Sequence, residues 1–138
     1  FYRNENLKFG IYEFDEAGRE IPGILWGAST KAVQAFYART GYALDFGFGD
    51  LPDHIGAELL FMARLCEDEG EARMRGDAGN AGNLAVLEGE FLDGHLGRFA
   101  PALAARVEDA TSQPFFRAWA ALLRAFVGAE GAGEKAAV

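Results

Sequence analysis

An aspartate–histidine pair, Asp53 and His54, follows Pro52 and opens a strongly apolar run, LPDHIGAELLFMARL. A carboxylate beside an imidazole suits acid–base catalysis, metal binding or the start of a helix. Adjacent residues of a helix point about 100° apart, so these two side chains would not face each other within one. A helix start, with Asp50 or Asp53 as the N-cap, therefore explains the pair at least as well as catalysis does.

The supply of ligands argues against a metal site. His54 and His95 are the two histidines of the chain, and Cys66 is its one cysteine. A structural zinc site takes four nitrogen or sulfur ligands, and these residues supply three. The Glu-x-x-His spacing of di-metal sites in helical bundles is absent as well. We expect no metal and no tightly bound cofactor.

Nucleophilic catalysis lacks a suitable reacting group. Cys66 lies among the acids of CEDEGE, which disfavour the reactive thiolate. Neither a Gly-x-Ser-x-Gly elbow nor a Walker loop occurs, and GFGD is a lone Gly-x-Gly. We expect a protein that is not an enzyme, with a small hydrolase using Asp53 and His54 as the alternative.

Composition narrows the class of partner. The chain has 138 residues, half of them hydrophobic, and a formal net charge of −8. This charge argues against nucleic acid and against an anionic membrane surface. No apolar run is long enough to cross a membrane, so we expect no membrane insertion. A single cysteine allows no internal disulfide and fits a reducing compartment best.

Hydrophobic periodicity predicts helices over most of the chain. Their spacing and punctuation predict five of them: one capped by Ser29 or Thr30 and ended by Gly41, one starting at 50–53, one over 84–99, one opened by Pro101, and one over 114–127 ended by Gly128. Before them, GIYEF and REIPGILWG flank the turn-like DEAG and allow a short hairpin. The predicted fold is all-α, a compact helical domain over residues 1–127 with an irregular N-terminal loop region and a disordered tail over 128–138.

The run that starts at Pro52 resembles the signature of the TorD/DmsD family of redox-enzyme maturation chaperones. That signature is a proline, an Asp-His pair and a helix with an E-L-x-F-M core, here Pro52, Asp53, His54, Glu58, Leu59, Phe61 and Met62. The flanking stretches KAVQAFYARTGYAL, EGEFLDGHLGRFAPALAARV and PFFRAWAALLRAFV resemble the family's neighbouring helices in the same order. The resemblance covers about residues 10–127, and the family's N-terminal helices are missing from this chain.

The resemblance implies a cytoplasmic chaperone. Such proteins bind the twin-arginine signal peptide of a molybdenum oxidoreductase in its apo form until the client's own molybdopterin cofactor is inserted. The peptide needs carboxylates for its arginines and an apolar groove for the rest. We expect the binding residues to be Pro52, Asp53, His54, Glu58, Asp50, Trp26, Tyr12, Phe46 and Phe48, the aromatic ones on loop position alone. A monomer or a homodimer is expected, and a helical oligomerisation domain without peptide specificity is a further alternative.

Overall fold

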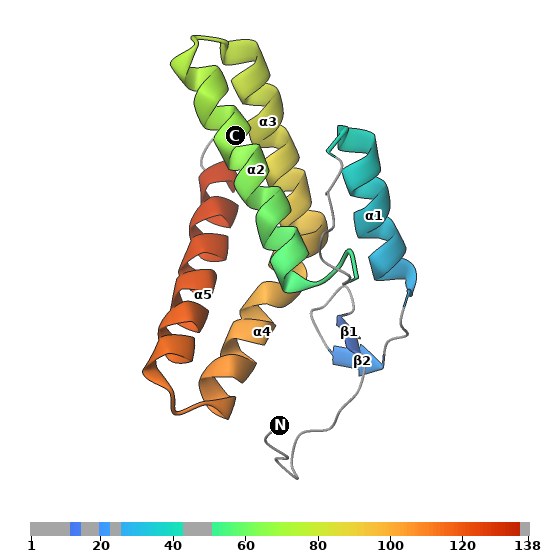
Figure 1. The fold of residues 1–138 in the computed structure, drawn as a ribbon, viewed down its shortest axis with the longest axis vertical. Coiled ribbons are helices and arrows are strands. Elements are labelled where there is room, and N and C mark those ends of the chain that lie inside the picture. Colours follow the sequence, from blue (N-terminus) through green and yellow to red (C-terminus); the bar gives the residue numbers. More distant parts are fainter. Residues whose placement is uncertain (1–11, 15–19, 23–25, 43–50, 136–138) are drawn as a thin grey trace.

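The structure is a computed structural model that describes residues 12–14, 20–22, 26–42 and 51–135, with side chains at 26–42 and 51–129. Helices dominate it, so the predicted all-α class is confirmed (Figure 1). The described elements are β1 (Tyr12–Phe14), β2 (Glu20–Pro22), α1 (Ala28–Thr40), α2 (Ile55–Met74), α3 (Ala78–Phe91), η1 (Leu92–Leu96), α4 (Gly97–Ala110) and α5 (Pro114–Lys135).

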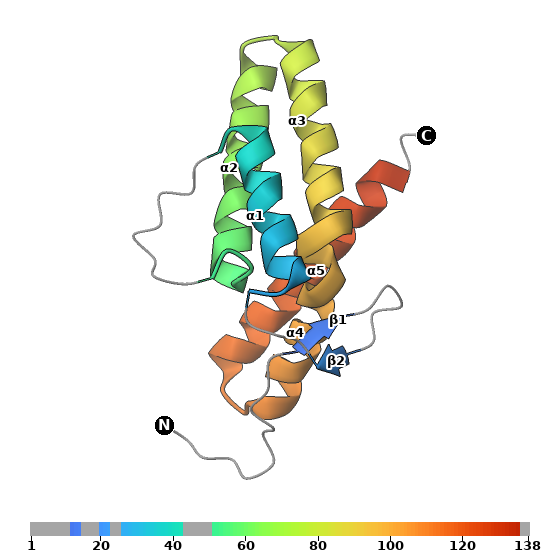
Figure 2. The same ribbon diagram turned by 90° about the vertical axis from the view of Figure 1, so that its right-hand side faces the viewer.

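Helices α2 and α3 form an antiparallel pair with α1 packed beside them (Figures 1 and 2). The turn between α2 and α3 uses Gly76 in the left-handed region, with φ of 75°, and Asp77 as the N-cap of α3. The helix predicted over 84–99 therefore begins earlier, at Ala78, directly after a tight turn. The rings of Phe36, Phe61 and Phe91 pack edge-to-face or tilted between the three helices, with centroids 4.6–5.8 Å apart.

A π-helical turn, η1, joins α3 to α4 without a break in the helix. Its extra residue widens the turn so that the Gly97 N–H reaches the Leu92 carbonyl, and the helix axis bends there (Figure 2). The prediction that Pro101 opens a helix is wrong, because Pro101 lies inside α4. The prediction had assumed a helix break, because proline has no N–H to donate and its ring presses on the preceding turn. The helix continues through Pro101 all the same.

Helix α5 packs mainly along α4 and extends toward α3. Its inner side buries Ala120, Leu123 and Val127. The predicted end at Gly128 is wrong, since α5 continues to Lys135, and the expected disorder does not apply to residues 128–135. Glycine is a poor helix former but does not by itself end a helix.

The N-terminal part contains the short hairpin that the sequence allowed beside an ordered loop. Strands β1 and β2 pair antiparallel, with Glu13 opposite Ile21. Helix α1 begins after Gly27, and neither Ser29 nor Thr30 is its N-cap, contrary to the prediction. Gly41 ends α1 in the left-handed region, with φ of 77°, as predicted.

Candidate functional site

The segment that leads into α2 is tied to α1 by two hydrogen bonds. The Thr30 hydroxyl donates to Asp53 Oδ2 at 2.5 Å, and the Tyr37 hydroxyl donates to the Pro52 carbonyl at 2.9 Å. Thr30 lies inside α1, whose N-cap is Gly27, and its hydroxyl makes this contact across the fold. We call Thr30, Pro52, Asp53, His54 and Glu58 the α1–α2 corner.

His54, and not an aspartate, is the N-cap of α2. Its Nδ1 accepts a hydrogen bond from the Gly56 N–H at 3.1 Å, and its ring is exposed. The prediction that Asp53 itself is the cap is therefore wrong, and Asp50 lies outside the described residues. Asp53 and His54 bond to different groups, which is the divergence expected of neighbours at a helix start.

Glu58 lies in the first turn of α2 and is buried, with 2% of the residue exposed. Its Oε2 atom has no hydrogen-bond partner among the described residues. Burial, and after it the nearby charge of Asp53, raises the pKa of Glu58 to about 9. Glu58 is therefore neutral at pH 7, and Asp53 carries the negative charge at this corner.

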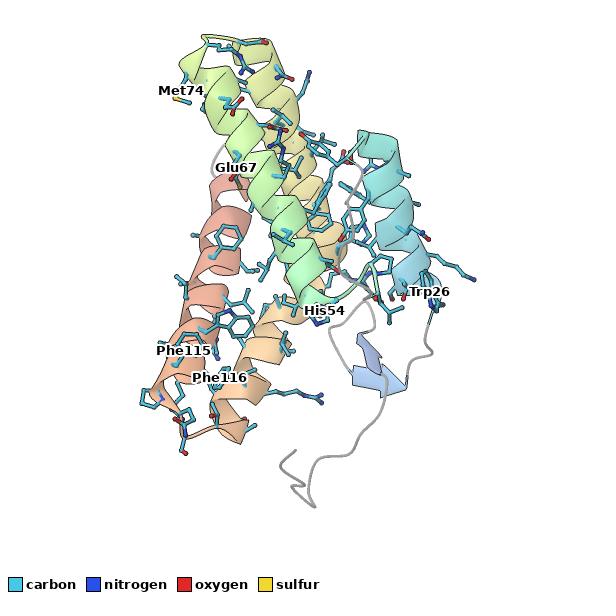
Figure 3. The ribbon with its side chains drawn as sticks, viewed as in Figure 1. Trp26, His54, Glu67, Met74, Phe115 and Phe116 are labelled. Atoms are coloured by element: carbon cyan, nitrogen blue, oxygen red, sulfur yellow. The ribbon has the colours of Figure 1, made fainter. Side chains whose placement is uncertain are left out.

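The remaining predicted site residues do not gather at the corner. Trp26 stands at the start of α1 with a φ of 59° and is 48% exposed. Its side chain lies away from His54 (Figure 3). Tyr12 lies in β1, where only the backbone is described, and Phe46 and Phe48 fall outside the described residues.

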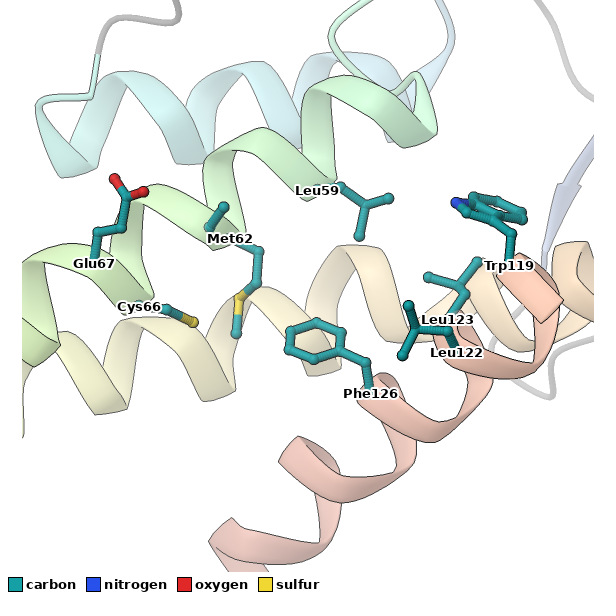
Figure 4. A pocket seen from close by; sticks show the side chains of 9 residues that line it. Leu59, Met62, Cys66, Glu67, Trp119, Leu122, Leu123 and Phe126 are labelled. Atoms are coloured by element: carbon teal, nitrogen blue, oxygen red, sulfur yellow. The ribbon is translucent and has the colours of Figure 1, made fainter. Parts of the chain in front are cut away.

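A second feature, an apolar groove between α2 and α5, was not predicted. Its volume is about 500 Å³ (Figure 4). From α2 it is lined by Leu59, Met62, Ala63, Cys66 and Glu67, and from α5 by Trp119, Leu122, Leu123 and Phe126. Glu67 is the one charged residue among them and lies at the Cys66 end, while Leu59 and Trp119 lie together at the other end (Figure 4). The groove, which we call the α2–α5 groove, suits an apolar ligand with one or two charges at its margins.

The described residues contain no group of three or more histidine, cysteine or acidic side chains placed to hold a metal ion. His95, the second histidine, lies in η1, and its ring packs against the rings of Phe36 and Phe91. Burial lowers the pKa of His95, and the nearby charges of Arg98 and Arg39 lower it further. This is the environment of a packing histidine, as its apolar neighbours in the sequence indicate.

Within the part of the chain that the structure describes, no helix is both long and apolar enough to cross a membrane.

Replacing Thr30 by valine tests the bond that holds the corner together. Valine keeps the side-chain volume but removes the hydroxyl that Asp53 accepts from. We expect the free energy of unfolding to fall by about 1.5–3 kcal/mol, the typical value for a hydrogen bond to a charged group. Urea unfolding measures it, with Ser29→Ala, at an exposed neighbouring position, as the control. Equal effects of the two substitutions would contradict a role for Thr30 in holding α2 against α1.

A comparison with protein families gives one match. The family model described as nitrate reductase delta subunit matches residues 13–105, which is more than half of the chain. The matched region includes the α1–α2 corner and the α2 wall of the groove, whereas α5 lies beyond it. No curated protein and no solved structure matches the chain.

Proposed function

This chain belongs to the nitrate reductase delta subunit family of redox-enzyme maturation chaperones, and from this premise we propose that it binds the twin-arginine signal peptide of a molybdenum-containing oxidoreductase. The observation that carries the proposal is the α2–α5 groove, an apolar channel on a chain with a net charge of −8. Such a peptide combines an apolar stretch with two arginines, and both parts have a counterpart on this surface.

The groove supports the apolar half of the ligand. Its volume of about 500 Å³ is that of a typical ligand site. From Leu59 to Cys66 and from Trp119 to Phe126 each wall spans about 10 Å, two helical turns. An apolar peptide helix lying between two such walls is a common mode of peptide recognition.

The α1–α2 corner supports the arginine half. Asp53 lies just before α2, at the end of the helix where Leu59 lines the groove, and it accepts a hydrogen bond from Thr30 of α1. A carboxylate near this end of the groove can pair with a guanidinium group. Because the arginines precede the apolar stretch, the peptide would run from Asp53 toward Cys66, parallel to α2.

The other candidate residues take lesser parts in this proposal. His54, exposed beside Asp53, contacts the peptide, and Pro52 fixes the entry to α2. Glu58 supports the corner from beneath, since it is buried and neutral. Asp50, Trp26, Tyr12, Phe46 and Phe48 stay candidates by their position in the sequence.

The rest of the proposed role follows from the family. Its members are chaperones and not enzymes, so the chain would hold a client and catalyse nothing. The molybdopterin cofactor would belong to the client oxidoreductase, and maturation would take place in the cytoplasm before export.

Titration of a fluorescent twin-arginine signal peptide tests the proposal, with a twin-lysine peptide as the control. We expect binding that needs the arginines and that weakens between low and high salt, because charge pairing at Asp53 is screened. Equal binding of both peptides, or no binding by folded protein, would contradict the proposed function.

Asp53→Asn tests whether Asp53 is the residue that contacts the peptide arginines. We expect peptide affinity to fall about tenfold to a hundredfold, which corresponds to a charge-assisted contact of about 1.5–3 kcal/mol. Asp109→Asn, exposed near the end of α4, makes the same change of charge elsewhere and is the matched control. A fall in stability with unchanged affinity would leave Asp53 only its structural bond to Thr30.

Cys66 offers a direct probe of the groove, because it is the only cysteine of the chain and lines the groove wall. We expect bound peptide to slow alkylation of Cys66 by a thiol reagent at least tenfold, in line with the fraction bound. Leu122→Ala should weaken this protection, whereas Leu60→Ala, an exposed leucine of α2 outside the groove, should not. If saturating peptide leaves the alkylation rate of Cys66 unchanged, the peptide binds outside the α2–α5 groove.

A further inference from the structure

Glu67 is the acid that the ion pairs of α2 leave least neutralised. The other three acids in the second half of the helix each pair with an arginine four residues away, as Arg64–Asp68, Arg73–Glu69 and Arg75–Glu71. Glu67 has a looser contact, 3.8 Å from its Oε2 to the Arg64 guanidinium, and Arg64 lies closer to Asp68, at 3.0 Å. Glu67 therefore still offers a negative charge to a ligand.

Glu67 also stands at one end of the α2–α5 groove. Figure 4 shows it beside Cys66, with Leu59 and Trp119 at the opposite end. It contributes the one carboxylate among the lining residues, and its side chain is 68% exposed, so the charge lies at the open rim and not in the floor. A peptide in the groove therefore meets this charge at the end of its apolar stretch.

The length of α2 sets how far this charge lies from the arginine end of the groove. Helix α2 begins at Ile55, directly after the segment that holds Asp53, and Glu67 follows 12 residues later. This separation corresponds to about 18 Å along the helix axis. A helical peptide that lies parallel to α2 rises at the same rate, so the residue about 12 positions after its arginines comes beside Glu67. We call this residue of the peptide the matched position.

We propose that Glu67 is a specificity-determining residue, which selects client peptides that carry a lysine or an arginine just beyond the apolar stretch. This inference rests on the proposed function and narrows its ligand to an apolar helix with a cation at each end. A cation at the matched position pairs with the Glu67 carboxylate, a neutral residue lacks the contact, and an acid is repelled. The apolar walls would accept all three peptides, so Glu67 supplies the discrimination.

The exposure of Glu67 sets the expected size of the effect. Ion pairs at exposed positions are weak, because water and salt screen them and because two long side chains must be ordered. We expect lysine at the matched position to bind about threefold more tightly than alanine, and glutamate about threefold less tightly. The preference therefore spans about tenfold from lysine to glutamate, and added salt should shrink it.

Fluorescent twin-arginine peptides that differ only at the matched position, with lysine, alanine or glutamate there, test the inference. We expect wild-type protein at low salt to bind them in that order of affinity. Glu67→Gln should reduce the spread to less than about twofold, and Glu67→Lys should reverse the order. Asp109→Asn removes a negative charge from α4, outside the groove, and should leave the order and the spread unchanged. A reversed preference is a result that a merely structural role of Glu67 would not give.

Shifting the lysine along the peptide tests the distance. Moved by one helical turn toward either end, the lysine should lose most of its advantage over alanine, and an advantage that does not depend on position would overturn the inference. Equal affinities of the lysine, alanine and glutamate peptides, or a spread that survives Glu67→Gln, would overturn it as well and leave the proposed function intact. Failure of every peptide to bind folded protein would instead count against the proposed function, and this inference would fall with it.

Discussion

Glu58→Gln is expected to raise the free energy of unfolding by about 3–5 kcal/mol at pH 8 and to change it little at pH 4. The folded pKa of Glu58 is raised to about 9 from an ordinary value of 4.5. Between these two values the unfolded chain releases the proton while the folded chain keeps it, so the contribution of Glu58 to stability falls as pH rises. One pKa unit corresponds to about 1.36 kcal/mol, and glutamine has no proton to release.

Urea unfolding of wild type and variant at pH 5, 6.5 and 8 measures this effect. Subtracting the two free energies of unfolding cancels the contributions of the other titrating groups. The difference that remains should grow with pH. Glu67→Gln, on the exposed side of the same helix, is the control and should give a small and nearly constant difference. A Glu58→Gln difference that does not depend on pH would contradict a buried, protonated Glu58.

Gly97→Ala is expected to lower the free energy of unfolding by about 2–4 kcal/mol, in the range of backbone strain and overpacking. A β-carbon at this position would lie 2.5 Å from the Leu92 carbonyl oxygen and 3.2 Å from its carbon. Both are backbone atoms of the π turn, and backbone cannot move aside as the end of a side chain can. The turn must therefore distort to admit alanine.

Gly94→Ala in the same turn is the matched control. A β-carbon there meets nothing within 4 Å, and alanine is favoured over glycine in a helix by about 1 kcal/mol. The two substitutions should thus shift the thermal midpoint in opposite directions. A gain in stability from both would show that η1 relaxes to an ordinary α-helical turn without cost.

The helices were predictable because their apolar spacing is regular, whereas their ends were less so. Ile55, Leu59, Met62 and Leu65 define α2 from sequence alone, and the structure buries Met62 and Leu65 fully. The prediction of the N-cap failed because two adjacent residues, an aspartate and a histidine, can each cap a helix. Which of them does so depends on a third residue, Thr30, which is 23 positions away and bonds the aspartate. Local sequence does not contain that contact.

The groove was missed for a related reason. Trp119, Leu122 and Phe126 share a face with residues that are buried, so periodicity assigns them to the core. Whether a second helix covers them depends on how α5 is placed against α2, which periodicity does not give. The π turn itself leaves no clear signal in LDGHL beyond Gly94 and the Gly97 that follows it.

The π turn can also be considered as an insertion of one residue into a helix. Helix α2 packs on α3, before η1, and α5 packs on α4, after it, so the two walls of the groove are attached on opposite sides of this insertion. The extra residue is taken up inside the turn, because the Gly97 N–H bonds five residues back, to the Leu92 carbonyl, where an α-helix would bond four residues back. The residues after the turn therefore keep nearly the facing that they would have without the insertion. A change in chain length at this bend is absorbed locally, and the two walls of the groove stay in register.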